Sequence, residues 1–271
     1  MRLYKEIVSA READTLFIGG GTPSFLETDL TDKLLCSVKK WIPSENLKEF
    51  TIECNPNSVT EEKLNLYKEA GVTRISLGMQ SACDEELKKL GRLHSVKEFE
   101  KTYELVRKHG FERVNIDVMA AIPGQTIESY KHTLEYVVGL SPEHISSYSL
   151  IIEEGTPFYE DNKLEELLPS EEDEVLMYRM TEKILNEYGY DKYEISNYAK
   201  PGFESRHNLG YWSHIPYLGV GLNASSYLDE KRFENPSDMK DYLEIQSFGD
   251  AYEGARSLSV YEPVSYTHLR A

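Results

Sequence analysis

The chain has 271 residues, of which 40% are hydrophobic and 28% charged, so it can form one large core or a main domain with a small appendage. Its formal net charge of −17 at pH 7 repels phosphate backbones and argues against nucleic-acid binding. No apolar stretch approaches the roughly 20 residues of a membrane span, and the first residues lack the pattern of a secretory signal, so we expect a cytoplasmic protein that does not span a membrane.

Short β-branched runs alternate with longer helical patterns over the first two thirds of the chain. Serial βα units of this kind predict a parallel sheet with right-handed crossovers. We therefore predict an α/β fold, a partial parallel (β/α) barrel whose first strand is missing. The predicted strands are residues 15–18, 50–53, 73–77, 114–119 and 145–150, and the helices between them are residues 29–41, 60–70, 96–109 and 127–140.

The composition changes after about residue 155, where a long helix is predicted over residues 171–188. A tyrosine-rich segment, residues 188–227, follows, and we expect it to cover one end of the barrel. A further helix is predicted at 239–246. We therefore predict a barrel core over residues 1–155, a C-terminal α+β extension over 156–262, and a tail over 263–271 that resembles translated vector sequence and is not native.

Small or polar residues stand at the ends of consecutive predicted strands. Because the carboxyl ends of parallel strands meet at one edge, these residues predict a shared ligand site. Each also has a plain alternative, since a glycine-rich turn can be structural and a carboxylate can simply be ion-paired. A carboxylate at a barrel mouth nevertheless needs a partner or a ligand. The residues are Gly20, Gly21 and Thr22 after the first strand, Glu53 at the end of the second, Gln80 after the third and Asp117 within the fourth.

The ordered series of motifs from about residue 14 to 227 resembles the radical S-adenosylmethionine family, in particular its branch of oxygen-independent coproporphyrinogen III oxidases and HemW-like haem chaperones. The triple glycine alone is a weak signal, whereas the complete series is specific. The motifs are FIGGGTPS at 17–24, IECNP at 52–56, RISLGMQS at 74–81, LGRLH at 90–94, NIDVM at 115–119 and IPGQT at 122–126.

The resemblance implies a binding site for S-adenosylmethionine. Acidic side chains suit ribose hydroxyls and an ammonium group, and an arginine fork suits a carboxylate. The family's glycine motif contacts the methionine part, which assigns that role to Gly20, Gly21 and Thr22. The remaining matched positions are Glu53, Gln80, Arg92 and Asp117 for the ribose, the carboxylate and nearby polar atoms, and Ile151 for backbone contact with adenine.

The motif HNLGYW at residues 207–212 matches the HNxxYW pattern of the chaperone branch, and we expect it in a loop. A histidine followed by aromatics can offer an axial nitrogen to iron and an apolar wall to a porphyrin. The resemblance therefore implies haem binding with His207 as the candidate iron ligand. A polar histidine beside packing aromatics is the plain alternative, and His214 is a competing ligand.

The family's radical chemistry needs a CxxxCxxC motif that holds a [4Fe–4S] cluster. Cys36, Cys54 and Cys83 are widely spaced and cannot replace it. We therefore expect a fragment that lacks the N-terminal cluster segment and the C-terminal domain, that has no catalytic residues and that is inactive as given. The cluster would belong to the full-length protein.

The leading function is a HemW-like haem chaperone that transfers haem to respiratory proteins and meets a membrane only through those acceptors. The alternative is an oxygen-independent coproporphyrinogen III oxidase, a radical decarboxylase of porphyrin biosynthesis. A third hypothesis is a non-radical α/β barrel enzyme in which Asp117 and Glu53 act as an acid–base pair on a substrate.

Overall fold

The computed structural model describes residues 8, 12–152, 155, 157–160, 167–245 and 256–257, so the predicted tail at 263–271 lies outside the described residues. The chain divides into two compact units. The first, here called the sheet unit, comprises residues 21–32 and 51–204; the second, the flanking unit, comprises residues 1–20, 33–50 and 205–271. The domain boundaries expected from composition stay a prediction.

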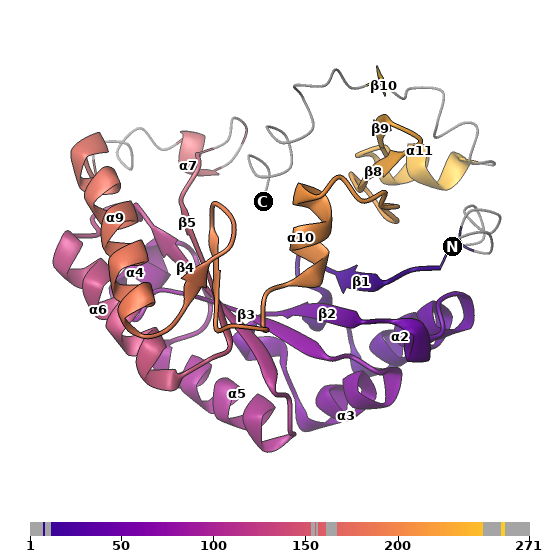
Figure 1. Ribbon diagram of the computed structural model, residues 1–271, viewed down its shortest axis with the longest axis horizontal. Helices are drawn as coiled ribbons and strands as arrows, with labels where there is room; N and C mark the ends of the chain where they lie inside the picture. Colours follow the sequence, from indigo (N-terminus) through magenta and orange to yellow (C-terminus); the bar gives the residue numbers. More distant parts are fainter. Residues whose placement is uncertain are drawn as a thin grey trace. The chain divides into compact units, whose positions relative to one another are not determined.

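The sheet unit is built on parallel strands that lie side by side in chain order. They are β2 (Glu49–Cys54, from Thr51 onward in this unit), β3 (Arg74–Gln80), β4 (Arg113–Ala120) and β5 (His144–Ser149). Because each right-handed crossover steps in the same direction, the connecting helices lie on one face of the sheet (Figure 1). These helices are α3 (Glu61–Ala70), α5 (Val96–Lys108) and α6 (Ile127–Leu140). This one-sided arrangement is the barrel type of α/β fold, as predicted.

Local signals explain where these helices begin and end. Thr60 accepts a hydrogen bond from the Lys63 N–H at the start of α3, and Gly71 ends that helix at φ 87°. Ser95 and Glu98 form a capping box at the start of α5. The predicted strand and helix positions are therefore confirmed for these elements.

The strands divide into an apolar face and a polar face. Residues that alternate along β3 and β4 are fully buried on the side of the helices, each contributing about 2 kcal/mol of hydrophobic free energy. The opposite side carries hydroxyl, amide and charged groups, here called the polar face. The apolar set is Ile52, Ile75, Leu77, Met79, Val114, Ile116, Val118 and Ile145, and the polar set is Glu53, Ser76, Asn115, Asp117, His144, Ser146 and Tyr148.

Two parts of the sheet differ from expectation. Strand β3 continues to Gln80, three residues beyond its predicted end, with a register shift between Gly78 and Gln80. Part of the segment expected to cover the barrel instead forms β6 (Asp191–Lys192) and β7 (Asn197–Ala199), and β7 pairs antiparallel with β5. The backbone groups on that edge of β5 need partners, and this hairpin supplies them.

The remaining elements of the sheet unit are short apart from one long helix. That helix, α9 (Glu171–Glu187), confirms the helix predicted at 171–188 and contacts α6. The others are α4 (Asp84–Lys89), α7 (Pro157–Glu160) and the 3₁₀ turns η1 (Pro23–Phe25) and η3 (Pro56–Ser58).

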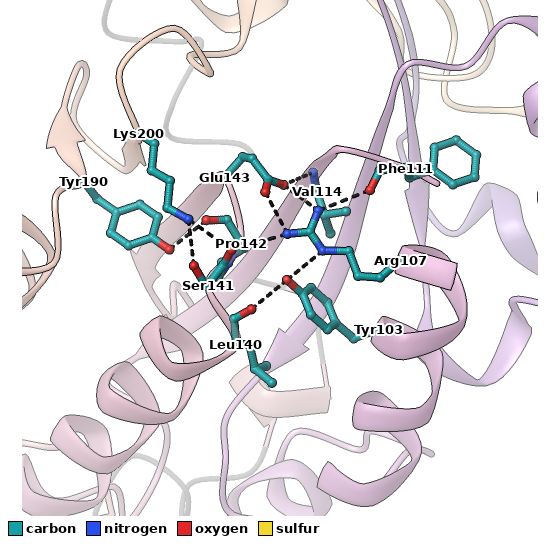
Figure 2. A network of polar contacts seen from close by, with 10 residues as sticks. All are labelled: Tyr103, Arg107, Phe111, Val114, Leu140, Ser141, Pro142, Glu143, Tyr190 and Lys200. Atoms are coloured by element: carbon teal, nitrogen blue, oxygen red, sulfur yellow. Dashed lines mark hydrogen bonds and ion pairs between the residues drawn. The ribbon is translucent and has the colours of Figure 1, made fainter. Parts of the chain in front are cut away.

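A polar network ties together the ends of the sheet unit's elements opposite the strand carboxyl ends. Arg107 donates to both carboxylate oxygens of Glu143, and Glu143 also accepts the Val114 N–H (Figure 2). Lys200 donates to the Ser141 carbonyl and hydroxyl. The network therefore fixes the starts of β4 and β5 against the ends of α5 and α6.

The flanking unit contains β1 (Thr15–Ile18), most of α2 (Thr28–Trp41) and the helix α10 (Arg206–Trp212). Its other elements are η2 (Ser44–Asn46), the antiparallel strands β8 (Ser225–Leu228), β9 (Lys231–Glu234) and β10 (Arg256–Ser257), and α11 (Met239–Glu244). Helix α11 confirms the helix predicted from residue 239. Among the helices that the structure describes, none combines the length and apolar character that crossing a membrane requires.

Candidate functional site

The Asp117 carboxylate lies on the polar face and is held by its neighbours on that face. Asn115 Nδ2 donates to Asp117 Oδ1 at 2.7 Å, and Ser76 Oγ donates to Asp117 Oδ2 at 3.2 Å. Burial raises the pKa of Asp117 above its usual value, and hydrogen bonds from Asn115, Ser146 and Ser76 oppose that rise. Each carboxylate oxygen retains a lone pair, so Asp117 can still accept hydrogen bonds from a ligand.

Gln80 has a strained backbone at the carboxyl end of β3. Its φ is 70°, in a left-handed region that non-glycine residues adopt rarely and that often marks a functional position. The Tyr148 hydroxyl donates to Gln80 Oε1 at 3.3 Å. A Cβ at Gly78 would lie 2.9 Å from Gln80 Nε2, so the glycine leaves room for the amide of Gln80.

Several predicted site residues lie around Tyr148, on β5. Burial raises the pKa of its hydroxyl, the charges of Asp117 and Glu53 raise it further, and Arg92 and the Gln80 hydrogen bond lower it. These four residues are therefore close enough to act on one phenol. The structure brings together the predicted residues Glu53, Gln80, Arg92 and Asp117.

Arg92 and Ile151 have less direct contact with the other predicted site residues. Arg92 is half-buried beyond α4, and its positive charge lowers the pKa of Asp117; no hydrogen bond or ion pair to its guanidinium is found among the described residues. An arginine in this state can receive a carboxylate. Ile151 follows β5 with 54% of its surface exposed, and its predicted contact with adenine stays a prediction.

The glycine turn after β1 has the conformation that its sequence predicts. Gly20 and Gly21 have φ angles of 78° and 109°, and Thr22 precedes the 3₁₀ turn η1. Among the described residues no atom lies within 4 Å of a Cβ built at either glycine, so the backbone angle, not packing, requires them. Buried Ser24 anchors the turn, because its hydroxyl accepts the Asn55 N–H at 2.9 Å.

Sequence reasoning missed the polar residues that support Asp117. The sequence pattern gives Ser76, Ser146 and Tyr148 no role beyond their strands, and His144 precedes the strand predicted at 145–150. Their period-two alternation with apolar neighbours is a signal that could have found them, since it places them on the same side as Asn115 and Asp117.

His207 lies in the flanking unit, and each of its ring nitrogens has a partner. Nδ1 is 2.9 Å from Thr15 Oγ1, and Nε2 is 2.8 Å from the Tyr211 hydroxyl. The ring stacks on Phe17 at a centroid distance of 5.1 Å. Burial lowers the pKa of His207 to about 4, so the imidazole is neutral at pH 7. The neutral form is the one that can bind a metal.

The motif at residues 207–212 forms the helix α10, not the predicted loop. Ser205 caps the helix by accepting the Asn208 N–H. The buried Glu49 carboxylate accepts the N–H groups of Arg206 and His207 at 3.1 Å each, which satisfies donors at the helix start. His214, the competing candidate, lies beyond the helix, is exposed, and has φ 54°.

The described residues do not provide a site for an iron–sulfur cluster. No group of three or more His, Cys, Asp or Glu side chains among them is arranged to hold a metal ion. Cys54 is buried, and burial raises the pKa of its thiol to about 12, so it is not a thiolate at neutral pH. Cys36 is exposed and Cys83 half-buried. No chemical step through a cluster is therefore derived for these residues.

Comparison with known proteins gives consistent similarities. Residues 1–137 match the model of the radical SAM superfamily. The chain is 39% identical to the heme chaperone HemW of Bacillus subtilis, over 92% of this chain and 67% of that protein. It is 40% identical to the heme chaperone HemW of Lactococcus lactis, over 84% of this chain and 61% of that protein. The chain thus spans about two thirds, or less, of the length of these relatives.

A solved structure shows the same fold. The coproporphyrinogen III oxidase HemN of Escherichia coli, a radical SAM enzyme, matches 95% of this chain and 64% of its own length. The TM-score is 0.74 and the identity 21%. At that identity the likeness establishes the fold and not the activity.

Proposed function

Because the chain belongs to the radical SAM superfamily, we propose that it is part of a HemW-like haem chaperone that binds S-adenosylmethionine and haem. Superfamily members use S-adenosylmethionine with a [4Fe–4S] cluster, which supplies electrons for reductive cleavage when bound. The described residues fit S-adenosylmethionine and do not fit the [4Fe–4S] cluster. The proposal places the protein in the cytoplasm, with haem-accepting respiratory proteins as partners.

The S-adenosylmethionine part of the proposal rests on the group of side chains around Tyr148. Asp117 and Glu53 are acceptors for ribose hydroxyls or an ammonium group, and Arg92 is a donor for a carboxylate. At Gly20 and Gly21 the absence of side chains lets a ligand approach the backbone closely. In this assignment Thr22 and Gln80 supply further polar contacts, and the backbone at Ile151 receives the adenine.

The haem part rests on one observation, the neutral imidazole of His207 on α10 beside Phe17 and Tyr211. Iron binding requires one ring nitrogen to lose its present partner. These partners are the Tyr211 hydroxyl at Nε2 and Thr15 Oγ1 at Nδ1. The aromatic rings would then pack against the porphyrin face.

Haem titration tests this assignment. The purified chain should produce a shifted Soret band with haem, and His207→Ala should weaken binding at least tenfold. His214→Ala is the matched control and should bind as the parent does. Equal Soret spectra for the parent and His207→Ala would remove His207 as the ligand, and loss of the band with His214→Ala alone would transfer the role.

The alternative function, an oxygen-independent coproporphyrinogen III oxidase, shares the fold and the proposed S-adenosylmethionine site. The residues described here favour neither its substrate nor its radical step. Incubating the full-length protein, with its cluster segment restored and anaerobically reduced, with S-adenosylmethionine and coproporphyrinogen III tests it, because the decarboxylase would release carbon dioxide and the chaperone would not. The third hypothesis, an acid–base enzyme, predicts turnover without S-adenosylmethionine.

A further inference from the structure

Hydrogen bonds link Tyr193 to Asp117 across the polar face through two buried side chains. The Tyr193 hydroxyl is 2.7 Å from His144 Nε2, and His144 Nδ1 is 2.6 Å from Asn115 Oδ1. Asn115 Nδ2 is 2.7 Å from Asp117 Oδ1. His144 and Asn115 are 1% and 4% exposed, so water does not compete for these contacts. Tyr193 comes from the turn between β6 and β7, which the sequence pattern did not identify as part of a site.

Asp117, the last member of this hydrogen-bond chain, determines which group donates and which accepts in every bond. An ionised Asp117 can only accept, so the nitrogen of the Asn115 amide must face it. The second Asn115 proton goes to Ser76 Oγ at 2.8 Å. The oxygen of the amide therefore faces His144 and must accept, which places the proton of the imidazole on Nδ1.

The remaining nitrogen of His144 then has a lone pair and must accept from Tyr193. A singly protonated ring is required, and burial together with the charge of Arg74 lowers the pKa of His144 well below its usual value. The Tyr193 hydroxyl donates to Nε2 at 2.7 Å. Reversing any one bond would bring two acceptors or two protons into contact at less than 3 Å.

We propose that Tyr193, His144 and Asn115 form a one-way hydrogen-bond chain that positions the Asp117 carboxylate as an acceptor for the hydroxyl groups of its ligand. The identity of the ligand, S-adenosylmethionine, rests on the proposed function. The hydrogen-bond chain itself does not depend on that identity. Tyr193, His144 and Asn115 are positioning residues, since they act through Asp117 and not on the ligand.

The charged and titratable groups around Asp117 explain why such a chain is useful. Burial favours the protonated carboxyl group, which would donate a hydrogen bond instead of accepting one. The Arg92 charge favours the ionised form. The charges of Asp117 and of Glu53, on β2, both raise the pKa of the Tyr148 phenol on β5. Donors that point toward Asp117 from Asn115 and Ser76 help Arg92 to keep the carboxylate ionised.

Nitrogen NMR of the unliganded full chain tests the direction. With ¹⁵N-labelled histidine, His144 should show a protonated Nδ1 and a bare Nε2 near pH 7. His144→Gln assigns the signal. A ring protonated at Nε2, or at both nitrogens near pH 7, would overturn the proposal.

Carbon NMR of Asp117 tests the effect. With ¹³C-labelled aspartate and Asp117→Asn for assignment, Tyr193→Phe should raise the pKa of Asp117. Tyr190→Phe is the matched control, because its buried hydroxyl donates to the Pro142 carbonyl at 2.7 Å and is not in the chain. The control should leave the titration of Asp117 unchanged. If both variants lower the melting temperature and neither shifts Asp117, the role is structural and the proposal fails.

Calorimetric titration with S-adenosylmethionine separates this inference from the proposed function. Tyr193→Phe should weaken binding about threefold at pH 7, with the loss growing as pH falls, whereas Tyr190→Phe should not. If the parent protein binds no S-adenosylmethionine at any pH while Tyr193→Phe still raises the pKa of Asp117, the proposed function fails and the hydrogen-bond chain stands.

Discussion

The guanidinium of Arg107 and the carboxylate of Glu143 face each other as a bidentate pair, with N–O distances of 2.7 and 2.8 Å (Figure 2). Neither side chain is more than 28% exposed. The same guanidinium donates to the Phe111 carbonyl, and the same carboxylate accepts the Val114 N–H. One pair thus connects the turn after α5, the start of β4 and the start of β5.

Removing Arg107 should destabilise the sheet unit. We expect Arg107→Ala to lower the free energy of unfolding by about 3 kcal/mol, because it leaves the Glu143 carboxylate without its charge partner. Urea denaturation measures the loss. Lys131→Ala, which breaks an exposed pair with Glu135, is the control and should cost less than about 0.5 kcal/mol. A loss of that small size for Arg107→Ala would show that the pair contributes little.

A methyl group at position 78 should impair ligand binding without unfolding the protein. In Gly78→Ala the new Cβ would lie 2.9 Å from Gln80 Nε2, so the Gln80 amide must move away from its present position. We expect weaker S-adenosylmethionine binding by calorimetry at nearly unchanged stability. Gly139→Ala, in α6 with no atom within 4 Å of the added Cβ, should stabilise by about 0.5 kcal/mol and bind normally. Normal binding by Gly78→Ala would exclude Gln80 from the site.

Asp117→Asn should stabilise the protein at neutral pH. The pKa of Asp117 is raised in the folded state by burial, so the folded state holds this proton more strongly than the unfolded state does. Its favourable contribution is present below the ordinary value of 3.8 and is lost as pH rises through the raised pKa. Above that window the variant should be more stable than the parent, with a higher melting temperature. A variant that melts below the parent at pH 7 would contradict this.

His207 should make stability fall on acidification. Burial lowers the pKa of His207 from 6.5 to about 4, so the unfolded state binds the proton first as pH falls. The contribution is complete above pH 6.5 and is lost between pH 6.5 and 4, by up to about 3 kcal/mol. Chemical denaturation at pH 7.5 and 5 should show this loss for the parent and much less of it for His207→Gln. His132→Gln, at an exposed position, should retain it.

Most of the fold of the sheet unit could be predicted from the sequence, because its signals are local. Thr60 and Gly71 bound a helix through backbone angles and caps that depend on a few neighbours. The alternation of Ile75 and Leu77 with Ser76 marks a strand in the same way. The antiparallel addition of β7 to β5 could not be predicted, since it depends on a pairing between residues about fifty positions apart.

The same difference between local signals and long-range pairing explains why only part of the site could be predicted. Glu53 and Gln80 stand at strand ends and Asp117 lies within β4, so all three could be identified from the strands alone. The partners of Asp117 depend on register, which aligns Gly78 with Asp117 and Asp117 with Ser146. The position of Tyr193 depends on the hairpin. The helical form of residues 206–212 depends on Glu49, which lies far away in the sequence.

The contact between Glu49 and α10 has a consequence for recognising this motif in other chains. A helix of seven residues is too short to persist in water by itself, so α10 takes its order from a carboxylate about 156 positions earlier. A chain that retains HNxxYW but lacks an acidic residue at the start of the corresponding strand would have the same motif without the same helix. The residue equivalent to Glu49 therefore distinguishes related chains that can form this helix from those that cannot.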